Sequence, residues 1–347
     1  MNRVGVLTGG GDCSGLNPAI RAIVRTAARA NWEVLGFLRG WKGLLQNETR
    51  PIGADGIDDL IARGGTVLGT SRTNPYKEKD GATRIQRVLE TNHLNALIAI
   101  GGEDTLGVAA KLFEELKIPI VGVPKTIDND LDATDFTIGF YSAVQIVTDS
   151  IDQLKTTAES HDRVMIVEIM GRHAGWLATY GGIAGGADVI LVPEFPMTLT
   201  QICEAVELCR KRGKRYAIIA VAEGAKVIAE NGHEIAEQSH EAVDAFDHVS
   251  LGGIGEVLRD LIKGKTGWDT RSTALGHVQR GGSPAAFDRI LGTAYGVRAM
   301  ELVLKGEFGK MPAHWQGQLT AVPLKAAVGK LKTLSPALYD LAKGFFG

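Results

Sequence analysis

Several features that would narrow the function at once are scarce in this sequence. The chain has only three cysteines, Cys13, Cys203 and Cys209, and their spacing matches no metal-binding motif. An odd, small number of cysteines is typical of a reduced cytoplasmic protein and not of a disulfide framework. The eight histidines form neither an H-E-x-x-H pattern nor a Cys/His zinc pattern. A zinc site of the common types is therefore not predicted.

Strong net charge and long apolar runs are also missing. The 38 basic and 40 acidic residues leave a net charge of −2, which gives no reason to expect nucleic acid or a membrane surface as a partner. No run is long enough for a membrane-spanning helix, and the first residues predict a strand and not a signal peptide. We therefore expect a cytoplasmic protein. The length is typical of about two domains, but no Pro- or Ser-rich linker separates them.

Glycine is abundant, with 44 residues that gather at the ends of apolar runs. These runs predict buried strands at 4–7, 34–37, 94–100, 118–123, 164–169, 188–192 and 216–222. Helical patterns lie between them, at 17–30, where Asn17 would be the N-cap, at about 105–116, and at 140–159, where one apolar stripe begins at Phe140. The alternation predicts an α/β protein with doubly wound, mostly parallel sheets. Ligands bind beyond the carboxyl ends of the strands in such folds.

Acidic residues follow the carboxyl ends of two of the predicted strands. Glu103 and Asp104 follow the strand 94–100, and Lys125, Asp128 and Asp130 follow the strand 118–123. Helix capping or turn formation could explain any one of these acids alone. Together they offer oxygen ligands for Mg²⁺ and a carboxylate that could remove a proton. The lysine could neutralise charge on a phosphoryl group in transfer.

Other candidates are a glycine-rich turn and a set of basic residues beside glycines. The turn 8–17 contains Gly10 and Gly11 and could bind an anion at a helix start, or it could be a tight turn without a ligand. Glu223 could accept a sugar hydroxyl or cap a helix. The basic residues stand at predicted strand ends, where guanidinium groups can bind phosphate: they are Arg72, Arg163, Arg172, Arg271, His277 and Arg280.

With these motifs in view, the chain resembles the 6-phosphofructokinase family from about residue 4 to 320. The matching motifs lie in the family's order: GGGDCSGLN (9–17), GG-T-LG-SR (64–72), GGEDT (101–105), PKTIDND (124–130), MGRHAGW (170–176), AEGA (222–225) and LGHVQRGG (275–282). The resemblance implies two similar α/β domains with the active site in the cleft between them. It implies transfer of a phosphoryl group to the 1-hydroxyl of fructose 6-phosphate, with Mg²⁺, in glycolysis or gluconeogenesis. Residues 1–138 plus about 250–305 would form the larger, donor-binding domain, and 139–249 plus about 306–347 the smaller, sugar-binding domain.

The resemblance also implies residue roles. Gly10 and Gly11 would line the donor site, Glu103 would bind Mg²⁺ where the family often has Asp, and Asp128 would be the base. Arg72 would act on the transferring phosphoryl group, and Asp130 would support substrate and metal. The substrate would be bound by Thr126, Ile127, Asp128, Arg163, Met170, Gly171, Arg172, Glu223, Arg271, His277, Val278, Gln279 and Arg280. Arg163 and Arg271 match residues that reach into a neighbouring subunit's site, which implies a homodimer or homotetramer with shared active sites.

The phosphoryl donor depends on two positions, Asp104 and Lys125. ATP-using members of the family usually have glycine at both, and this pair resembles the pyrophosphate-dependent branch. A carboxylate at Asp104 would repel the α-phosphate of ATP, and Lys125 would add positive charge beside pyrophosphate. The alternatives are an ATP-dependent enzyme with a shifted nucleotide and a non-catalytic regulatory subunit, which would require a damaged site. Asp128, Arg163, Arg172 and Arg280 are all intact.

Overall fold

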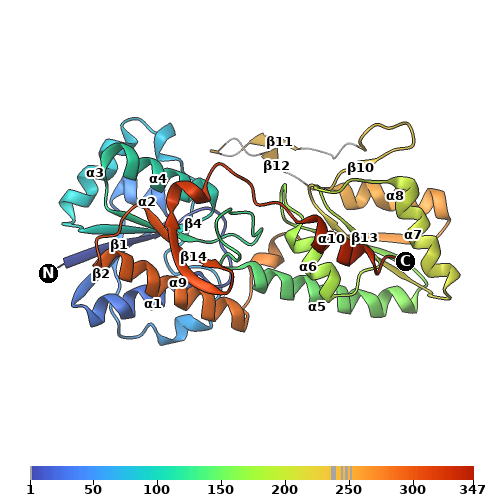
Figure 1. Ribbon diagram of the computed structural model, residues 1–347, viewed down its shortest axis with the longest axis horizontal. Helices are drawn as coiled ribbons and strands as arrows, with labels where there is room; N and C mark the ends of the chain where they lie inside the picture. Colours follow the sequence, from blue (N-terminus) through green and yellow to red (C-terminus); the bar gives the residue numbers. More distant parts are fainter. Residues whose placement is uncertain (1, 236–239, 244, 247–248, 251) are drawn as a thin grey trace.

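The computed structural model describes the chain except residues 1, 236–239, 244, 247–248 and 251. The described residues form two lobes, each built on its own sheet (Figure 1). The sheet of the first lobe has the strand order β15-β14-β5-β4-β1-β2-β3, and that of the second has the order β13-β6-β9-β7. The predicted α/β architecture with mostly parallel sheets is confirmed.

The first lobe holds the N-terminal sheet, which is parallel except at its two edge strands, β3 and β15. Its strands are β1 (Asn2–Thr8), β2 (Trp32–Phe37), β3 (Thr49–Pro51), β4 (Ala96–Gly101), β5 (Ile120–Pro124), β14 (Lys310–Trp315) and β15 (Gln318–Pro323). Val4 and Val6 belong to the core that includes α1 (Leu16–Arg29) and α9 (Ala286–Leu304). Leu7 belongs to the core on the other face, with α2 (Trp41–Gln46), α3 (Gly81–Thr91) and α4 (Glu103–Leu116). This lobe also has the short helices η1 (Asp58–Ile61), η2 (Pro75–Lys77) and η4 (Leu324–Ala327).

The second lobe has a wholly parallel sheet. Its strands are β6 (Val164–Ile169), β7 (Val189–Leu191), β9 (Ala217–Ala222) and β13 (Thr270–Ala274), and its helices are α5 (Phe140–Ser160), α6 (Trp176–Ala184), α7 (Leu199–Lys211), α8 (Ile254–Thr266), η3 (Gly276–Arg280) and α10 (Pro336–Lys343). Two short ribbons pair β8 (Met197–Thr198) with β10 (Val227–Ile228), and β11 (His240–Val243) with β12 (Val249–Ser250). Every residue of β6 and β9 is buried, which explains their unbroken apolar sequences.

The predicted assignment of the C-terminal segments to the domains needs correction. β13 pairs with β6, so α8 and β13 lie with the second sheet and not with the first. β14 pairs with β5 and β15 with β14, so 310–323 lies with the first sheet and not with the second. These strands are only partly buried and contain polar residues, so no continuous apolar run in the sequence marks them as strands.

The predicted N-cap of the first helix was also wrong. α1 begins at Leu16 after Gly15, which adopts a φ of 123° and makes no side-chain cap. The buried amide of Asn17 instead donates to the carbonyls of Arg63 (3.0 Å) and Gly64 (3.1 Å) and accepts from the N–H of Val67 (2.8 Å). Asn17 therefore fixes the loop 63–67 beside the glycine-rich turn.

The sheet register gathers the predicted site loops at one edge. Gly101 at the end of β4 lies opposite Pro124 at the end of β5, and Thr8 at the end of β1 lies opposite Ile100. The loops that follow these three strands consequently start side by side, and the segment between β5 and α5 lies between the lobes (Figure 1). Within the described residues, no helix is long and apolar enough to cross a membrane.

Candidate active site

One pocket collects most of the predicted donor and catalytic residues. It is lined by Gly10, Gly11, Asp12, Arg72, Gly102, Glu103, Asp104, Thr105, Lys125, Thr126, Ile127, Asp128, Asp130, Arg172 and Arg280. Arg172 comes from the loop after β6, and Arg280 ends η3, so both lobes contribute. The two acidic strand ends that the sequence indicated therefore form one site.

Lys125 lies beneath the glycine-rich turn. Its side chain is buried, and its Nζ donates to the carbonyl of Gly11 at 2.5 Å. Burial lowers the pKa of Lys125, and the nearby Arg280 guanidinium lowers it further. Gly10 has a φ of 78°, and a β-carbon at Gly11 would stand 2.5 Å from the Arg280 guanidinium. The positive φ favours glycine at position 10, and a side chain at position 11 would have to displace the Arg280 guanidinium.

Asp128 is buried in the pocket, and its Oδ1 has no hydrogen-bond partner among the residues that the structure describes. Burial raises the pKa of this carboxyl, and the charge of Glu223 raises it further, whereas Arg172 and Arg280 oppose the shift. Burial, with the charge of Asp128, raises the pKa of Asp130 to about 6. An unpartnered carboxylate with a raised pKa is suited to accept a proton from a ligand.

Glu103 and Asp104 occupy the first turn of α4, where the helix dipole favours acids. Glu103 is exposed, and its Oε1 accepts the N–H of Gly329 at 3.0 Å. Among the described residues, no group of three or more His, Cys, Asp or Glu side chains could hold a metal by itself. Mg²⁺ is usually held by one or two carboxylates together with phosphate oxygens and water. Glu103 fits a Mg²⁺ ion of that kind.

Glu223 shapes the loop that carries Arg172. Its Oε1 accepts the N–H groups of Arg172 (3.0 Å) and Gly171 (3.3 Å), and burial raises its pKa. A β-carbon at Gly171 would stand 2.5 Å from the carbonyl of Ala174, so this tight loop requires glycine. Met170 is half-buried at the start of the same loop.

Eight predicted substrate-binding residues lie outside the pocket lining: Met170, Gly171 and Glu223, described above, and Arg163, Arg271, His277, Val278 and Gln279. Arg163 and Arg271 both bind Asp269, at 2.7 and 3.1 Å, at the amino ends of β6 and β13. The six residues of β6 lie between Arg163 and Met170, and the seven steps between these two residues span about 23 Å at about 3.3 Å per strand residue. In η3, His277 is exposed and Val278 is 62% exposed, whereas Gln279 is buried.

The structure adds residues to which the sequence analysis gave no role. Asp12, Gly102 and Thr105 all line the pocket. A charged residue within a glycine-rich turn was the available signal for Asp12. Thr105 had no such signal, because a buried threonine in the first turn of a helix is common in cores. It lies so close to Gly9 that a β-carbon there would stand 2.5 Å from its hydroxyl.

The family model described as phosphofructokinase matches residues 3–303. The chain belongs to the phosphofructokinase family. It is 54% identical to the pyrophosphate–fructose 6-phosphate 1-phosphotransferase of Amycolatopsis methanolica, over 99% of this chain and 100% of that protein. It is 45% identical to the ATP-dependent 6-phosphofructokinase of Mycobacterium bovis, over 99% of this chain and 100% of that protein.

Solved structures show the same fold. A crystal structure of phosphofructokinase from Pichia pastoris matches with a TM-score of 0.83 and 31% identity. The match covers 94% of this chain and 35% of the yeast chain, so this chain spans about a third of that protein.

Proposed function

We propose that the protein transfers a phosphoryl group from pyrophosphate to the 1-hydroxyl of fructose 6-phosphate, giving fructose 1,6-bisphosphate and phosphate. The observation that carries the choice of donor is the placement of Asp104 and Lys125 in one pocket with Gly10 and Gly11. The reaction belongs to glycolysis and gluconeogenesis, and the enzyme would work in the cytoplasm.

The surroundings of Asp104 support a short donor. Glu103 and Asp104 line the site pocket and also a neighbouring cavity, which Tyr76, Gly107 and Lys111 help to form. A nucleotide with its phosphates in the site and its nucleoside in the neighbouring cavity would have to pass these two carboxylates. Pyrophosphate needs only the inner pocket. Placing like charges together costs several kcal/mol, and about 1.4 kcal/mol already changes an affinity tenfold.

The pocket provides the groups that phosphoryl transfer needs. Asp128 would accept the proton of the 1-hydroxyl as its oxygen bonds to phosphorus and the bridging P–O bond of pyrophosphate breaks. Lys125 and Arg72 would stabilise the charge on the phosphoryl group and on the departing phosphate. Glu103 would hold Mg²⁺, which when bound neutralises phosphate charge. Because the donor is a single phosphoanhydride, the reaction should run in both directions.

The sugar phosphate would lie between the lobes. Met170, Gly171, Arg172 and Glu223 would hold the sugar beside Asp128, as would Thr126 and Ile127. Arg280, with His277, Val278 and Gln279, would hold the 6-phosphate. Arg163 and Arg271 stand at the far end of their strands, which supports the proposal that they serve a neighbouring subunit's site. The protein would then be a homodimer or homotetramer with shared active sites.

A coupled assay with each donor tests the proposal. Purified protein is assayed with fructose 6-phosphate, Mg²⁺ and either pyrophosphate or ATP, with the Asp128→Ser variant as the control for contaminating activity. We expect turnover with pyrophosphate, in both directions, and turnover with ATP that is weaker or lacking. Turnover with ATP and none with pyrophosphate would refute the assignment of the donor and favour an ATP-dependent 6-phosphofructokinase.

A further inference from the structure

The loop 126–138, which carries Asp128 and Asp130 from β5 to α5, closes on itself. The Oδ1 of Asn129 accepts the N–H of Thr137 at 3.1 Å, and the hydroxyl of Thr137 donates to the carbonyl of Thr126 at 2.6 Å. Asn129 is buried and adopts a φ of 52°. These contacts define the shape of the loop but do not fix where the loop lies between the lobes.

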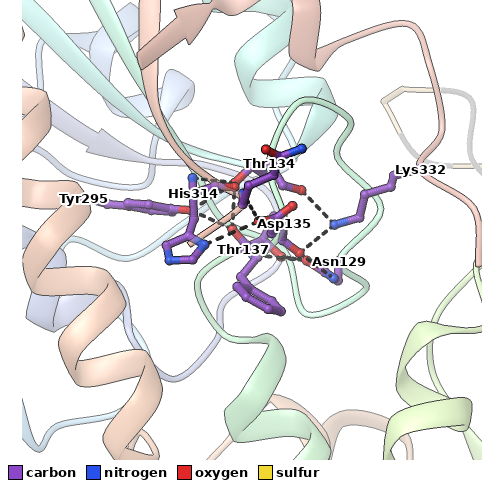
Figure 2. A network of polar contacts seen from close by, with 9 residues as sticks. Asn129, Thr134, Asp135, Thr137, Tyr295, His314 and Lys332 are labelled. Carbon is purple, nitrogen blue, oxygen red and sulfur yellow. Dashed lines mark hydrogen bonds and ion pairs between the residues drawn. The ribbon is translucent and has the colours of Figure 1, made fainter. Parts of the chain in front are cut away.

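The first lobe holds this loop from one side (Figure 2). Tyr295 of α9 donates its hydroxyl to the carbonyl of Phe136 at 2.8 Å and lies 3.0 Å from the hydroxyl of Thr134. The N–H of Asp135 donates to the carbonyl of His314, on β14, at 2.7 Å. These bonds join the loop to the lobe that already carries it on β5.

Lys332 holds the same loop from the opposite side (Figure 2). Its Nζ donates to the carbonyls of Thr134 and Asp135, both at 2.9 Å, and its backbone N–H donates to the carbonyl of Asp130 at 2.8 Å. The carbonyl of Asp135 also accepts the side-chain amide of Asn129 at 3.2 Å. The carbonyl of Asp135 therefore links the ammonium group of Lys332 to Asn129, the residue that follows Asp128.

Lys332 is also bound to the second lobe. It lies in the segment 328–335, which runs from η4 in the first lobe to α10 in the second. Its carbonyl accepts the indole N–H of Trp176 at 2.8 Å, and its Nζ stands 5.1 Å from the centre of that ring. Trp176 begins α6, directly after the loop that carries Arg172. Two residues on, the N–H of Leu334 donates to Glu194, whose carboxylate also binds the N–H of Gly175.

We propose that Lys332 is a positioning residue that fixes the loop 126–138 against the start of α6, so that Asp128 and Arg172 keep their places across the site. Hydrogen bonds from an ammonium group to carbonyls are charge-assisted and strong, and the half-buried Lys332 forms two of them from a segment joined to both lobes. The inference rests on the proposed role of Asp128 as the base. Misplacing a catalytic group by about 1 Å can cost about a hundredfold in rate, so a residue that never touches substrate can have a large effect on turnover.

The decisive comparison is between Lys332→Met, Lys332→Arg and Lys330→Met. Lys330 is the matched control, because it lies two residues away and also pairs with the loop, at Asp132 (2.8 Å), but from a side chain that is 76% exposed, where an ion pair contributes little. In Lys332→Met, kcat should fall about 10- to 100-fold while the KM values change less than about threefold. Lys332→Arg keeps donors for both carbonyls and should recover most of kcat, and Lys330→Met should match the wild type within about twofold.

Amide hydrogen exchange provides a readout that does not depend on turnover. Residues 126–138 should exchange faster in Lys332→Met, with no change in α1. Wild-type kcat and wild-type exchange in Lys332→Met would overturn the proposal, as would equal losses in all three variants. If Lys332→Met does not fold, Trp176→Phe, which removes the indole N–H together with part of the ring, should change kcat and exchange in the same direction but by less. A wild-type protein without turnover on either donor would refute the proposed function, whereas the exchange data would still test the positioning.

Discussion

At the scale of single residues, Asp104 stands where the site pocket meets its neighbouring cavity, and it should decide the donor. We expect Asp104→Gly to lower kcat/KM for pyrophosphate and to raise use of ATP at least about tenfold, because removing the carboxylate removes several kcal/mol of repulsion toward a nucleotide. Steady-state kinetics with each donor measures both effects. Glu114→Gly, on the exposed face of the same helix, is the control for glycine in α4.

An Asp104→Gly enzyme with full pyrophosphate activity and no gain with ATP would contradict this role. Lys125 alone would not decide the donor, because a lysine beneath the glycine-rich turn could assist either phosphate chain. If Gly10 and Gly11 line the donor site as proposed, Lys125, which binds the carbonyl of Gly11, would lie beside phosphates that ATP and pyrophosphate have in common.

The pH dependence of turnover should follow the raised pKa values of Asp128 and Asp130. A general base must be ionised, so kcat/KM should fall as the pH drops through the pKa of Asp128, which burial and the charge of Glu223 raise above its ordinary value. Removing the nearby charge of Glu223 lowers the pKa of Asp128. The acidic limb of Glu223→Gln should therefore lie at lower pH than that of the wild type. The substrates titrate identically in both assays, so the difference reports the protein, and an unchanged limb would argue against Asp128 as the base.

Site residues that follow strand ends could be predicted from the sequence. A residue proposed to act on the site without contacting substrate, such as Lys332, could not. Glu103, Asp104, Lys125 and Asp128 could be found because an apolar run that ends in charged residues has few explanations in a parallel sheet. Lys332 lies in a polar stretch near the C-terminus, and a lone lysine there is usually solvated. Its place became visible only when two lobes and a loop were brought together around it.

At the scale of elements, Asp288 joins two helices. This fully buried residue of α9 accepts the N–H of Gly139 (2.8 Å), the N–H of Ser142 (2.7 Å) and the hydroxyl of Ser142 (2.6 Å) at the start of α5. Asp288→Ala leaves these donors buried without a partner, so the free energy of unfolding should fall by about 3 kcal/mol. Thermal or denaturant unfolding checks this value.

Two further variants distinguish the loss of the Asp288 bonds to the start of α5 from the effect on stability of removing any carboxylate. Asp288→Asn keeps one acceptor and should lose less stability than Asp288→Ala. Asp260→Ala removes a carboxylate that is 70% exposed on α8 and should change the unfolding free energy by less than about 0.5 kcal/mol. Equal losses in Asp288→Ala and Asp260→Ala would show that the cap contributes nothing specific.

The elements that the sequence predicted are those buried on both sides. β6 and β9 are wholly buried, and their apolar runs give nearly the observed bounds. β13 and β15 are edge strands with polar, half-exposed residues, so their sequences carry no comparable pattern. The cap of α5 was equally hidden, because Asp288 lies 146 residues from Ser142 in the chain.

At the scale of the whole molecule, the chain passes between the lobes more than once. It enters the second lobe at α5, returns to the first with α9, β14 and β15, and ends in the second with α10. Sequence motifs give the order of the site residues along the chain. They do not show which sheet a later strand joins, because either sheet can be extended at its edge. The predicted boundaries at about 250, 305 and 306 failed for that reason.

The same arrangement leads to a test of shared active sites. Arg163 and Arg271 stand at the strand ends opposite the loop that carries Arg172, too far to serve the pocket of their own chain. If a partner uses them, Arg163→Met and Asp128→Ser should each be inactive alone but should complement each other. In a mixed dimer, one site then has an intact Asp128 and receives an intact Arg163 from the partner.

Random refolding or co-expression of the two variants should therefore recover about a quarter of the wild-type activity, because half of the dimers are mixed and each has one complete site. The control is a mixture of Asp128→Ser with Lys125→Met. Both changes lie in the pocket of one chain, so every site keeps one defect and no activity should return. Recovery in the first mixture alone would require an arginine from a neighbouring subunit. No recovery in either mixture would mean that Arg163 acts within its own chain or only holds Asp269, and the shared-site proposal would fall.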